Sequence, residues 1–210
     1  MSAPRQPWAI KRWDVYAPHY DRWVAFERQR RRSLALADLQ PGERVLLDGC
    51  GTGLDLPLVP PGLEIDAVDL SPGMLALARC RAAGLNARVQ VMDAQSLRFP
   101  AHTFDCVVLH LIVAIVPDPL QCLREAVRVL KPGGRVVLFD KFFHGPGKPR
   151  LIRRLLNPFL KLAATDLNVP LPRLAAEAGL VIVHEEPAWL RGMFRVVRLE
   201  PKTRSSASAE

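Results

Sequence analysis

The chain has 210 residues, of which 49% are hydrophobic, and it carries a formal net charge of +8 at pH 7. This length and apolar content suit one globular domain with a sizeable core, which excludes a disordered chain, and the sequence shows no internal repeat. The apolar runs fall well short of the roughly 20 residues that a membrane-spanning helix needs, so the sequence predicts none.

The amino-terminal residues and the cysteines both favour a cytoplasmic protein. Pro4, Arg5, Pro7 and Lys11 precede any apolar block, a pattern that lacks the apolar core of a signal peptide. The four cysteines are scattered without a Cys-x-x-Cys pair, and we expect them to be reduced and structural. Histidine and cysteine are too sparse for the spacing of metal ligands, so no metal site is predicted.

The predicted elements begin with an amino-terminal helical layer over residues 8–39 and continue with alternating strands and helices. Five apolar runs rich in Val, Ile and Leu predict strands buried on both faces, at 44–47, 64–68, 88–92, 105–112 and 135–139. Ser71 and Pro72 open a helix that Gly84 is placed to end, and a second helix spans 120–130. The sequence at 131–134 predicts a turn into the fifth strand.

The carboxy-terminal part adds two strands, at 181–184 and 194–199, joined through residues 187–192, and a polar tail that we expect to be disordered. Alternating strands and helices predict an α/β fold with a parallel, doubly wound sheet. A ligand should then lie at the carboxyl ends of the strands, where Asp69, Asp93 and His110 fall.

A glycine-rich stretch follows the first strand, with Gly49, Gly51 and Gly53 spaced two apart. Glycine tolerates positive φ and has no Cβ, so the backbone can turn sharply and approach a ligand. Asp69, at the end of the second strand, can accept hydrogen bonds from the hydroxyls of a ribose. Leu54 stands where a dinucleotide motif places its third glycine, which favours an adenosine cofactor without phosphates.

From about Tyr16 to Leu199 the chain resembles the class I S-adenosylmethionine-dependent methyltransferases, on the strength of this loop and its acids. The resemblance implies a Rossmann-like, seven-stranded sheet, mostly parallel with an antiparallel last strand, and S-adenosyl-L-methionine as cofactor. It implies that the loop contacts the methionine part, that Asp69 binds the ribose and that Asp93 and Ala94 bind the adenine. The cofactor-binding residues expected from it are Gly49, Cys50, Gly51, Gly53, Asp69, Leu70, Met74, Asp93, Ala94 and Tyr20.

One position departs from the family pattern. The family places an acid two residues before the first glycine, where this chain has Leu47, and Asp48 stands one residue later. Because side chains alternate along a strand, the carboxylate of Asp48 is expected to point to the opposite face of the sheet. The sequence therefore leaves open whether Asp48 contacts the cofactor.

His110 and Tyr20 are the candidate catalytic residues. Orienting the acceptor in line with the methyl group can lower the barrier to methyl transfer by about 7 to 11 kcal/mol. A general base is needed only if the acceptor nucleophile arrives protonated. His110 ends the fourth strand and is the best-placed base, or else it only hydrogen-bonds near the sheet edge; His144 is a weaker candidate. In similar quinone and phospholipid methyltransferases a Tyr-x-x-x-Tyr-Asp stretch forms a lid, which implies that Tyr20 lies over the cofactor. Its ring can attract a sulfonium; the alternative is an aromatic helix that packs on the core.

The positive charge is concentrated in two clusters. The first comprises Arg28, Arg30, Arg31 and Arg32, and the second comprises Lys148, Arg150, Arg153, Arg154 and Lys161. Near the second cluster, apolar residues recur in adjacent pairs four apart, so they share one helical face while the cations occupy the other. This pattern predicts a basic amphipathic insert within 141–170 that either binds an anionic membrane surface or packs on the domain as a lid. Nucleic acid is a less favoured partner, because the chain lacks an added RNA-binding module.

The chain as a whole is most similar to bacterial phospholipid N-methyltransferases and quinone C-methyltransferases, from its aromatic start to the basic segment after the fifth strand. This resemblance implies one methyltransferase domain over residues 1–200, peripheral to the inner face of the membrane, which N-methylates an aminophospholipid headgroup of the phosphatidylethanolamine type. The alternatives are a methyltransferase for a quinone precursor or a soluble small molecule, an RNA methyltransferase, and a cofactor-binding protein without catalysis.

Overall fold

The computed structural model describes residues 7–142 and 169–202. His144, the cationic cluster from Lys148 to Lys161 and the polar tail lie outside these residues. Within the described part of the chain, no helix has both the length and the apolar composition needed to cross a bilayer.

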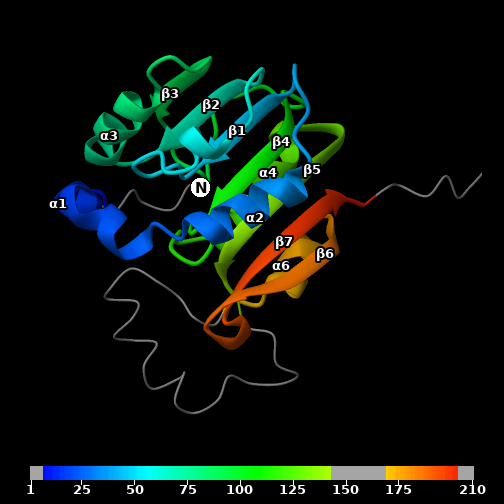
Figure 1. Cartoon of the computed structure of the whole chain (residues 1–210). Coiled ribbons are helices and arrows are strands. Elements are labelled where there is room, and N and C mark those ends of the chain that lie inside the picture. Colours follow the sequence, from blue (N-terminus) through cyan, green and yellow to red (C-terminus); the bar gives the residue numbers. More distant parts are fainter. Residues whose placement is uncertain (1–6, 143–168, 203–210) are drawn as a thin grey trace, which may run out of the picture.

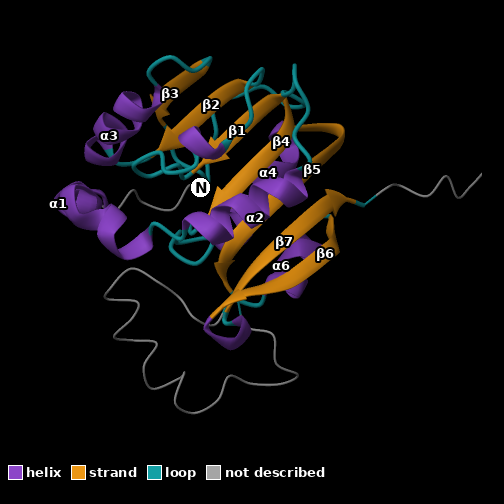
Figure 2. Ribbon diagram, viewed as in Figure 1, coloured by secondary structure: helices purple, strands orange, loops and turns teal. Residues whose placement is uncertain are grey.

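The described residues form a seven-stranded sheet in the order β3-β2-β1-β4-β5-β7-β6 (Figures 1 and 2). The strands are β1 Arg44–Asp48, β2 Glu64–Asp69, β3 Ala87–Val91, β4 Phe104–His110, β5 Leu130–Lys141, β6 Leu180–Trp189 and β7 Phe194–Pro201. Strands β1 to β5 are parallel to one another, whereas β7 runs antiparallel to both β5 and β6. The predicted Rossmann-like sheet, with its antiparallel last strand, is confirmed.

Helices cover both faces of the sheet. They are α1 Pro7–Val24, α2 Glu27–Ala37, α3 Pro72–Ala82, α4 Pro119–Val129 and α6 Leu171–Glu177. The apolar residues of α2 and α3 share one buried cluster with β1, and those of α4 and α6 share another with β4 and β5. Figure 1 shows α2 across the front of the sheet and α4 and α6 behind it. The sheet is therefore buried on both faces, as its apolar strands predict.

Two helices begin with side-chain caps, α3 at the predicted cap Ser71 and α4 one residue before its predicted start at 120. The Ser71 hydroxyl accepts a hydrogen bond from the Met74 amide at 3.1 Å at the start of α3. Asp118 caps α4 in the same way, through the Gln121 amide at 3.0 Å. Because each cap satisfies a backbone donor that has no partner inside the helix, it fixes the residue at which the helix begins.

Two boundaries differ from the prediction. Residues 131–134 do not form a simple turn before the strand but loop out within β5, since Leu130 pairs with Phe104 and the register resumes at Cys106 and Arg135. A Cβ on Gly134 would lie 2.9 Å from the Asp105 carbonyl oxygen, so this loop needs glycine. Strand β6 continues to Trp189, beyond its predicted end at 184, because its second half pairs with β7.

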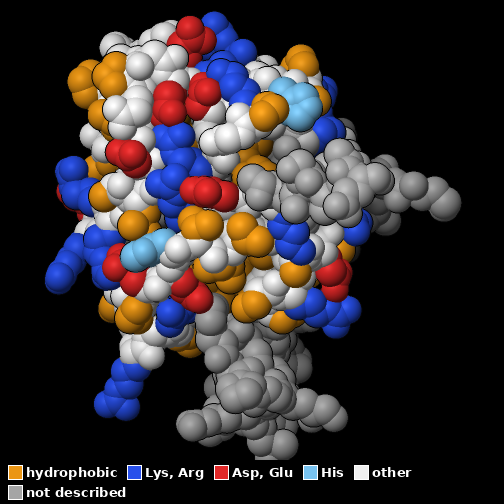
Figure 3. Space-filling view, turned by 90° about the vertical axis from the view of Figure 1, so that its right-hand side faces the viewer, with side chains coloured by type: hydrophobic (Ala, Val, Ile, Leu, Met, Phe, Trp, Pro, Cys, Tyr) orange, Lys and Arg blue, Asp and Glu red, His pale blue; other side chains and the backbone are white. Residues whose placement is uncertain are grey.

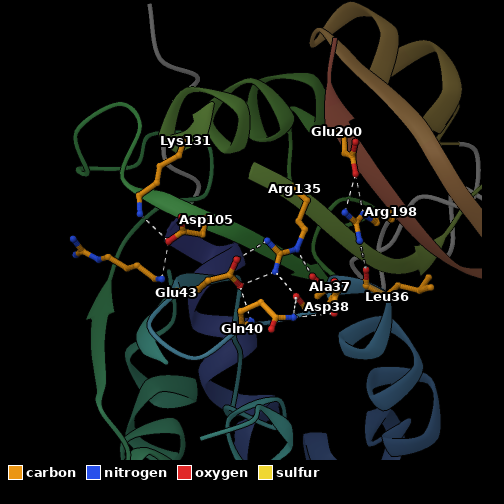
Figure 4. Close-up of polar contacts among 11 residues, drawn as sticks. Leu36, Ala37, Asp38, Gln40, Glu43, Asp105, Lys131, Arg135, Arg198 and Glu200 are labelled. Atoms are coloured by element: carbon orange, nitrogen blue, oxygen red, sulfur yellow. Dashed lines mark hydrogen bonds and ion pairs between the residues drawn. The ribbon is translucent and has the colours of Figure 1, made fainter. Parts of the chain in front are cut away.

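Two arginines of the sheet hold the carboxyl end of α2 (Figure 4). The Arg135 guanidinium donates hydrogen bonds to the carbonyl oxygens of Ala37 and Asp38 and forms an ion pair with Glu43 at 2.6 Å. Arg198 donates to the Leu36 carbonyl oxygen at 3.1 Å. Cations are favourable at a helix carboxyl terminus, so these contacts fix α2 on the sheet.

Replacement of Arg135 by Met is expected to destabilise the protein by about 3 kcal/mol, because the Glu43 carboxylate and the last carbonyl groups of α2 lose their partner. Urea denaturation at pH 7 would measure this difference. Arg79→Met is the matched control, since Arg79 lies exposed on α3. Equal stability of the two variants would show that Arg135 does not anchor α2.

Candidate active site

The glycine loop after β1 lies at the carboxyl edge of the sheet and has a backbone that only glycine adopts easily. Gly49, Gly51 and Gly53 have φ values of 71°, 55° and 82°. A Cβ on Gly49 would lie 2.6 Å from the Ile112 side chain, and one on Gly53 would lie 3.0 Å from the Ala78 backbone. The loop is thus packed closely against its neighbours and presents bare backbone, as the sequence predicts.

Asp69 links this loop to the start of α3. One carboxylate oxygen accepts a hydrogen bond from the Gly51 amide and the other from the Ser71 amide, both at 2.9 Å. Burial raises the pKa of Asp69, although these amides act in the opposite direction. A carboxylate has about four acceptor positions, so each oxygen can still receive a ligand hydroxyl.

The other predicted cofactor residues fall at the same edge. Asp93 follows β3, and its carboxylate accepts hydrogen bonds from the Gln95 backbone and side chain at 2.9 and 3.1 Å. Ala94, Cys50 and Met74 are buried, and Leu70 is half-buried beside Asp69. The fold therefore brings the predicted cofactor-binding residues that follow β1, β2 and β3 to the same edge of the sheet.

Asp48 is buried at the end of β1 without a hydrogen-bond partner for either carboxylate oxygen in the part of the chain that the structure describes. Strand alternation places it on the face of Leu46, which belongs to the cluster under α4, and opposite to Leu47. Burial raises the pKa of Asp48 to about 8, and the charges of Asp69 and Asp93 act in the same direction.

Helix α1 lies over the glycine loop and is held there by two aspartates. One Asp14 oxygen accepts hydrogen bonds from the Ser71 hydroxyl and from the Gly73 amide at the start of α3. Asp21 accepts from the Thr52 hydroxyl at 2.6 Å and pairs with Arg81. These contacts connect the amino-terminal layer to both sides of the loop.

Tyr20 projects from α1 toward the loop, because a Cβ on Gly51 would lie 3.7 Å from its ring. The Trp13 ring meets the Tyr20 ring edge-on, with centroids 6.2 Å apart. Burial is the main cause that raises the pKa of Tyr20 to about 12, so its hydroxyl stays protonated at neutral pH. The position agrees with a contact to the cofactor, which stays a prediction.

His110 lies in a buried polar network under α2. Its Nδ1 is 2.8 Å from an Asp55 carboxylate oxygen, and its Nε2 is 2.8 Å from the Ser33 hydroxyl. The second Asp55 oxygen forms an ion pair with Arg30 at 2.7 Å. Both ring nitrogens thus have protein partners, and a proton can reach His110 only through Ser33 or after one of these bonds opens.

Sequence reasoning missed Asp55 and Ser33 and misplaced Arg30. The sequence placed Arg30 in the first cationic cluster, but the structure buries it to 4% exposure, where Asp55 neutralises it and the Ala25 carbonyl oxygen accepts from its Nε at 2.9 Å. The signal was helical spacing, since Arg30, Ser33, Leu34 and Ala37 share the buried face of α2. Nothing in the local sequence marks Asp55 as their partner.

Comparison with known proteins identifies the family. A family model described as a methyltransferase domain matches residues 46–138. A Cereibacter sphaeroides protein named phosphatidylethanolamine N-methyltransferase is 32% identical over 196 residues, covering 91% of this chain and 95% of that protein. The chain belongs to the class I S-adenosylmethionine-dependent methyltransferases.

Other methyltransferases match less of their own length or only in fold. The ubiquinone/menaquinone biosynthesis C-methyltransferase UbiE of Geobacter sulfurreducens is 36% identical over 156 residues, and the match covers 67% of this chain and 59% of that protein. A methyltransferase solved with the Haloferax volcanii Trm112 activator superposes with a TM-score of 0.74 at 16% identity, over 89% of this chain and 96% of that one. At this identity the likeness concerns the fold alone.

The residues at the carboxyl edge fit S-adenosyl-L-methionine. The loop offers three glycines at positive φ, Asp69 retains acceptor positions, and Asp48 is a buried carboxylate without a partner among the described residues. A bound cofactor carries a methyl group on a sulfonium cation, which a set of buried acids favours. This methyltransferase would hold it with the loop, Asp69, Asp93 and Tyr20.

Gly53→Ala is expected to lower cofactor affinity by at least tenfold, because the new Cβ would meet Ala78 and push the loop out of place. Gly84→Ala is the matched control, since Gly84 also has positive φ but no atom within 4 Å of its Cβ position. Calorimetric titration with S-adenosylmethionine would measure both. The expectation fails if Gly53→Ala binds as tightly as Gly84→Ala.

Asp55→Asn is expected to destabilise the protein by about 3 kcal/mol at pH 7, because it leaves the buried Arg30 guanidinium without a counter-charge. Burial alone would raise the pKa of Asp55, but His110 and Arg30 hold it well below its usual range. Such a depressed pKa gives stability that is present above the unfolded-state pKa, about 4, and is lost as the pH falls below it.

The stability difference between the wild type and Asp55→Asn should therefore shrink below about pH 4. Urea denaturation from pH 3 to 7 measures it, with Asp118→Asn as control, because Asn caps a helix as well as Asp does. A difference that does not change with pH would mean that the Asp55 charge is not what stabilises the network.

Proposed function

We propose that this methyltransferase N-methylates an aminophospholipid headgroup, of the phosphatidylethanolamine type, at a membrane surface. The observation that carries the proposal is the near end-to-end similarity to the Cereibacter sphaeroides phosphatidylethanolamine N-methyltransferase, which is matched over 95% of its length. The quinone methyltransferases are matched over a smaller share, 59% for the Geobacter sulfurreducens protein. The present chain thus resembles the phospholipid enzyme in overall size as well as in its cofactor loop.

The chemistry of the site is compatible with an amine acceptor. An ammonium must lose a proton before its nitrogen can attack the sulfonium methyl group, and the site holds titratable groups at its edge. Lys141 ends β5 with a pKa lowered by burial, next to Asp140, whose pKa burial raises. His110 remains our candidate base, with Ser33 as the hydroxyl through which it would receive the proton.

Peripheral membrane binding is the second part of the proposal. Arg31 pairs with Glu27 and Arg32 with Glu186, so the negative charge of these acids offsets part of the positive charge that α2 offers to acidic lipids. On the face seen in Figure 3, cationic and anionic side chains are mixed. We therefore assign the contact with anionic lipid to the basic sequence from Lys148 to Lys161, where each cation near the surface contributes about 1 kcal/mol.

An assay with the full-length protein, S-adenosylmethionine and mixed vesicles of phosphatidylethanolamine and phosphatidylglycerol tests the proposal. We expect N-methylated lipid, detected by mass spectrometry, at a rate that falls steeply when phosphatidylglycerol is replaced by a neutral lipid. A demethylated quinone and soluble amines serve as competing acceptors. Methylation of the quinone or of a soluble amine, with none of the phospholipid, would exclude the aminophospholipid assignment.

A further inference from the structure

Asp48 stands out among the buried acids because, in the described part of the chain, neither a cation nor a well-formed hydrogen bond compensates its charge. Its exposure is 1%, and neither oxygen has a hydrogen-bond partner within residues 7–142 and 169–202. By contrast, Asp55 has Arg30 and His110, and Asp140 accepts from the amides of Ala114 and Lys141 at 2.9 and 2.7 Å. A buried carboxylate without a partner is costly when it is charged, so an empty protein favours its neutral form.

The titratable groups that face Asp48 add to this cost. Asp69 at the end of β2, Asp93 after β3 and Glu125 on α4 are acids that disfavour a further negative charge. The thiols of Cys50 and Cys122, from the glycine loop and α4, have pKa values that burial raises well above the usual range, so they are neutral. The Gly49 amide acts in the opposite direction but is outweighed, and burial leaves Asp48 with a pKa of about 8.

The cofactor and the product of methyl transfer differ by one positive charge, and no described cation lies beside Asp48 to play the same role. S-adenosylmethionine has a sulfonium, an ammonium and a carboxylate, so its net charge is positive at neutral pH. The demethylated product, S-adenosylhomocysteine, has a neutral thioether and no net charge. A nearby cation favours the ionised form of a carboxylate, and in a buried site the interaction is only weakly screened.

We propose that Asp48 makes the site prefer the sulfonium cofactor over its thioether product, by releasing a proton to solvent when the cofactor binds and taking one up after methyl transfer. In this scheme the O–H bond of the Asp48 carboxyl group breaks and the proton passes to water. The carboxylate then offsets the cofactor charge. Loss of the methyl group removes that charge, the carboxylate is protonated again, and the product gains nothing from Asp48.

The proposal fixes the direction of the pH dependence. Below about pH 8, Asp48 must lose its proton before its carboxylate can attract the cofactor, and this loss costs free energy. Cofactor affinity should therefore rise with pH and level off above about pH 8. Product affinity should not follow this rise. The ammonium group of the cofactor titrates as well, but it does so equally in the wild type and in a variant without the carboxylate.

Calorimetric titration in two buffers of different ionisation enthalpy, at pH 7, counts the protons released. We expect wild-type protein to release a fraction of a proton more than Asp48→Asn on binding S-adenosylmethionine, and the same amount as Asp48→Asn on binding S-adenosylhomocysteine. Asp48→Asn should weaken cofactor binding about tenfold, a change of about 1.4 kcal/mol, and change product binding less than twofold.

Asp66→Asn is the matched control, because Asp66 is equally buried on β2 but forms an ion pair with Arg44 at 2.8 Å. It should leave the ratio of cofactor to product affinity unchanged. Equal weakening of both ligands by Asp48→Asn would assign the residue a purely structural role and overturn the proposal. Should Asp48→Asn fail to fold, the proton count of the wild type decides alone, since equal release with cofactor and product would contradict the proposal.

Discussion

Burial of negative charge at the carboxyl edge of the sheet is the constraint on which the active site depends. Each buried aspartate is compensated in a different way. Asp69 is held by backbone amides, Asp55 by an arginine and a histidine, and Asp48 by no described residue. Because an uncompensated charge is costly in a low-dielectric interior, these contacts decide which groups are ionised. A protein with a net charge of +8 thus presents acids to a cationic cofactor.

The same contacts join the amino-terminal layer to the cofactor loop. Asp14 and Asp21 attach α1 to the start of α3 and to Thr52, and Arg30 attaches α2 to Asp55, which follows the loop closely. The glycines keep the loop in a conformation that these partners require. A change in the conformation of the loop would therefore alter the contacts of α1 and α2. For this reason we include residues of both helices in the candidate site.

The positive charge of the chain has a different distribution from the one its sequence suggests. Arg30 forms a buried ion pair with Asp55, Arg31 and Arg32 pair with Glu27 and Glu186 at or near the surface, and Arg135 and Arg198 hold the end of α2. Arginine suits these places because its planar group can bond several oxygens at once. Clustered cations in a sequence are thus weak evidence of an acidic partner until their contacts are known.

The sequence by itself determined the alternation of strands and helices, the helix start at Ser71, and the glycine loop with Asp69 beside it. These features depend on residues close together in the chain, through periodicity, capping and the backbone freedom of glycine. Tertiary structure alone decided the network of Ser33, Asp55 and His110, since its members lie 55 and 77 residues apart and only packing of α2 on the sheet brings them together. It also decided that Asp48 has no hydrogen-bond partner among the described residues, since this depends on which side chains pack around it. The loop at 131–134 likewise depends on how β5 pairs with β4, which the residues of the loop do not determine alone.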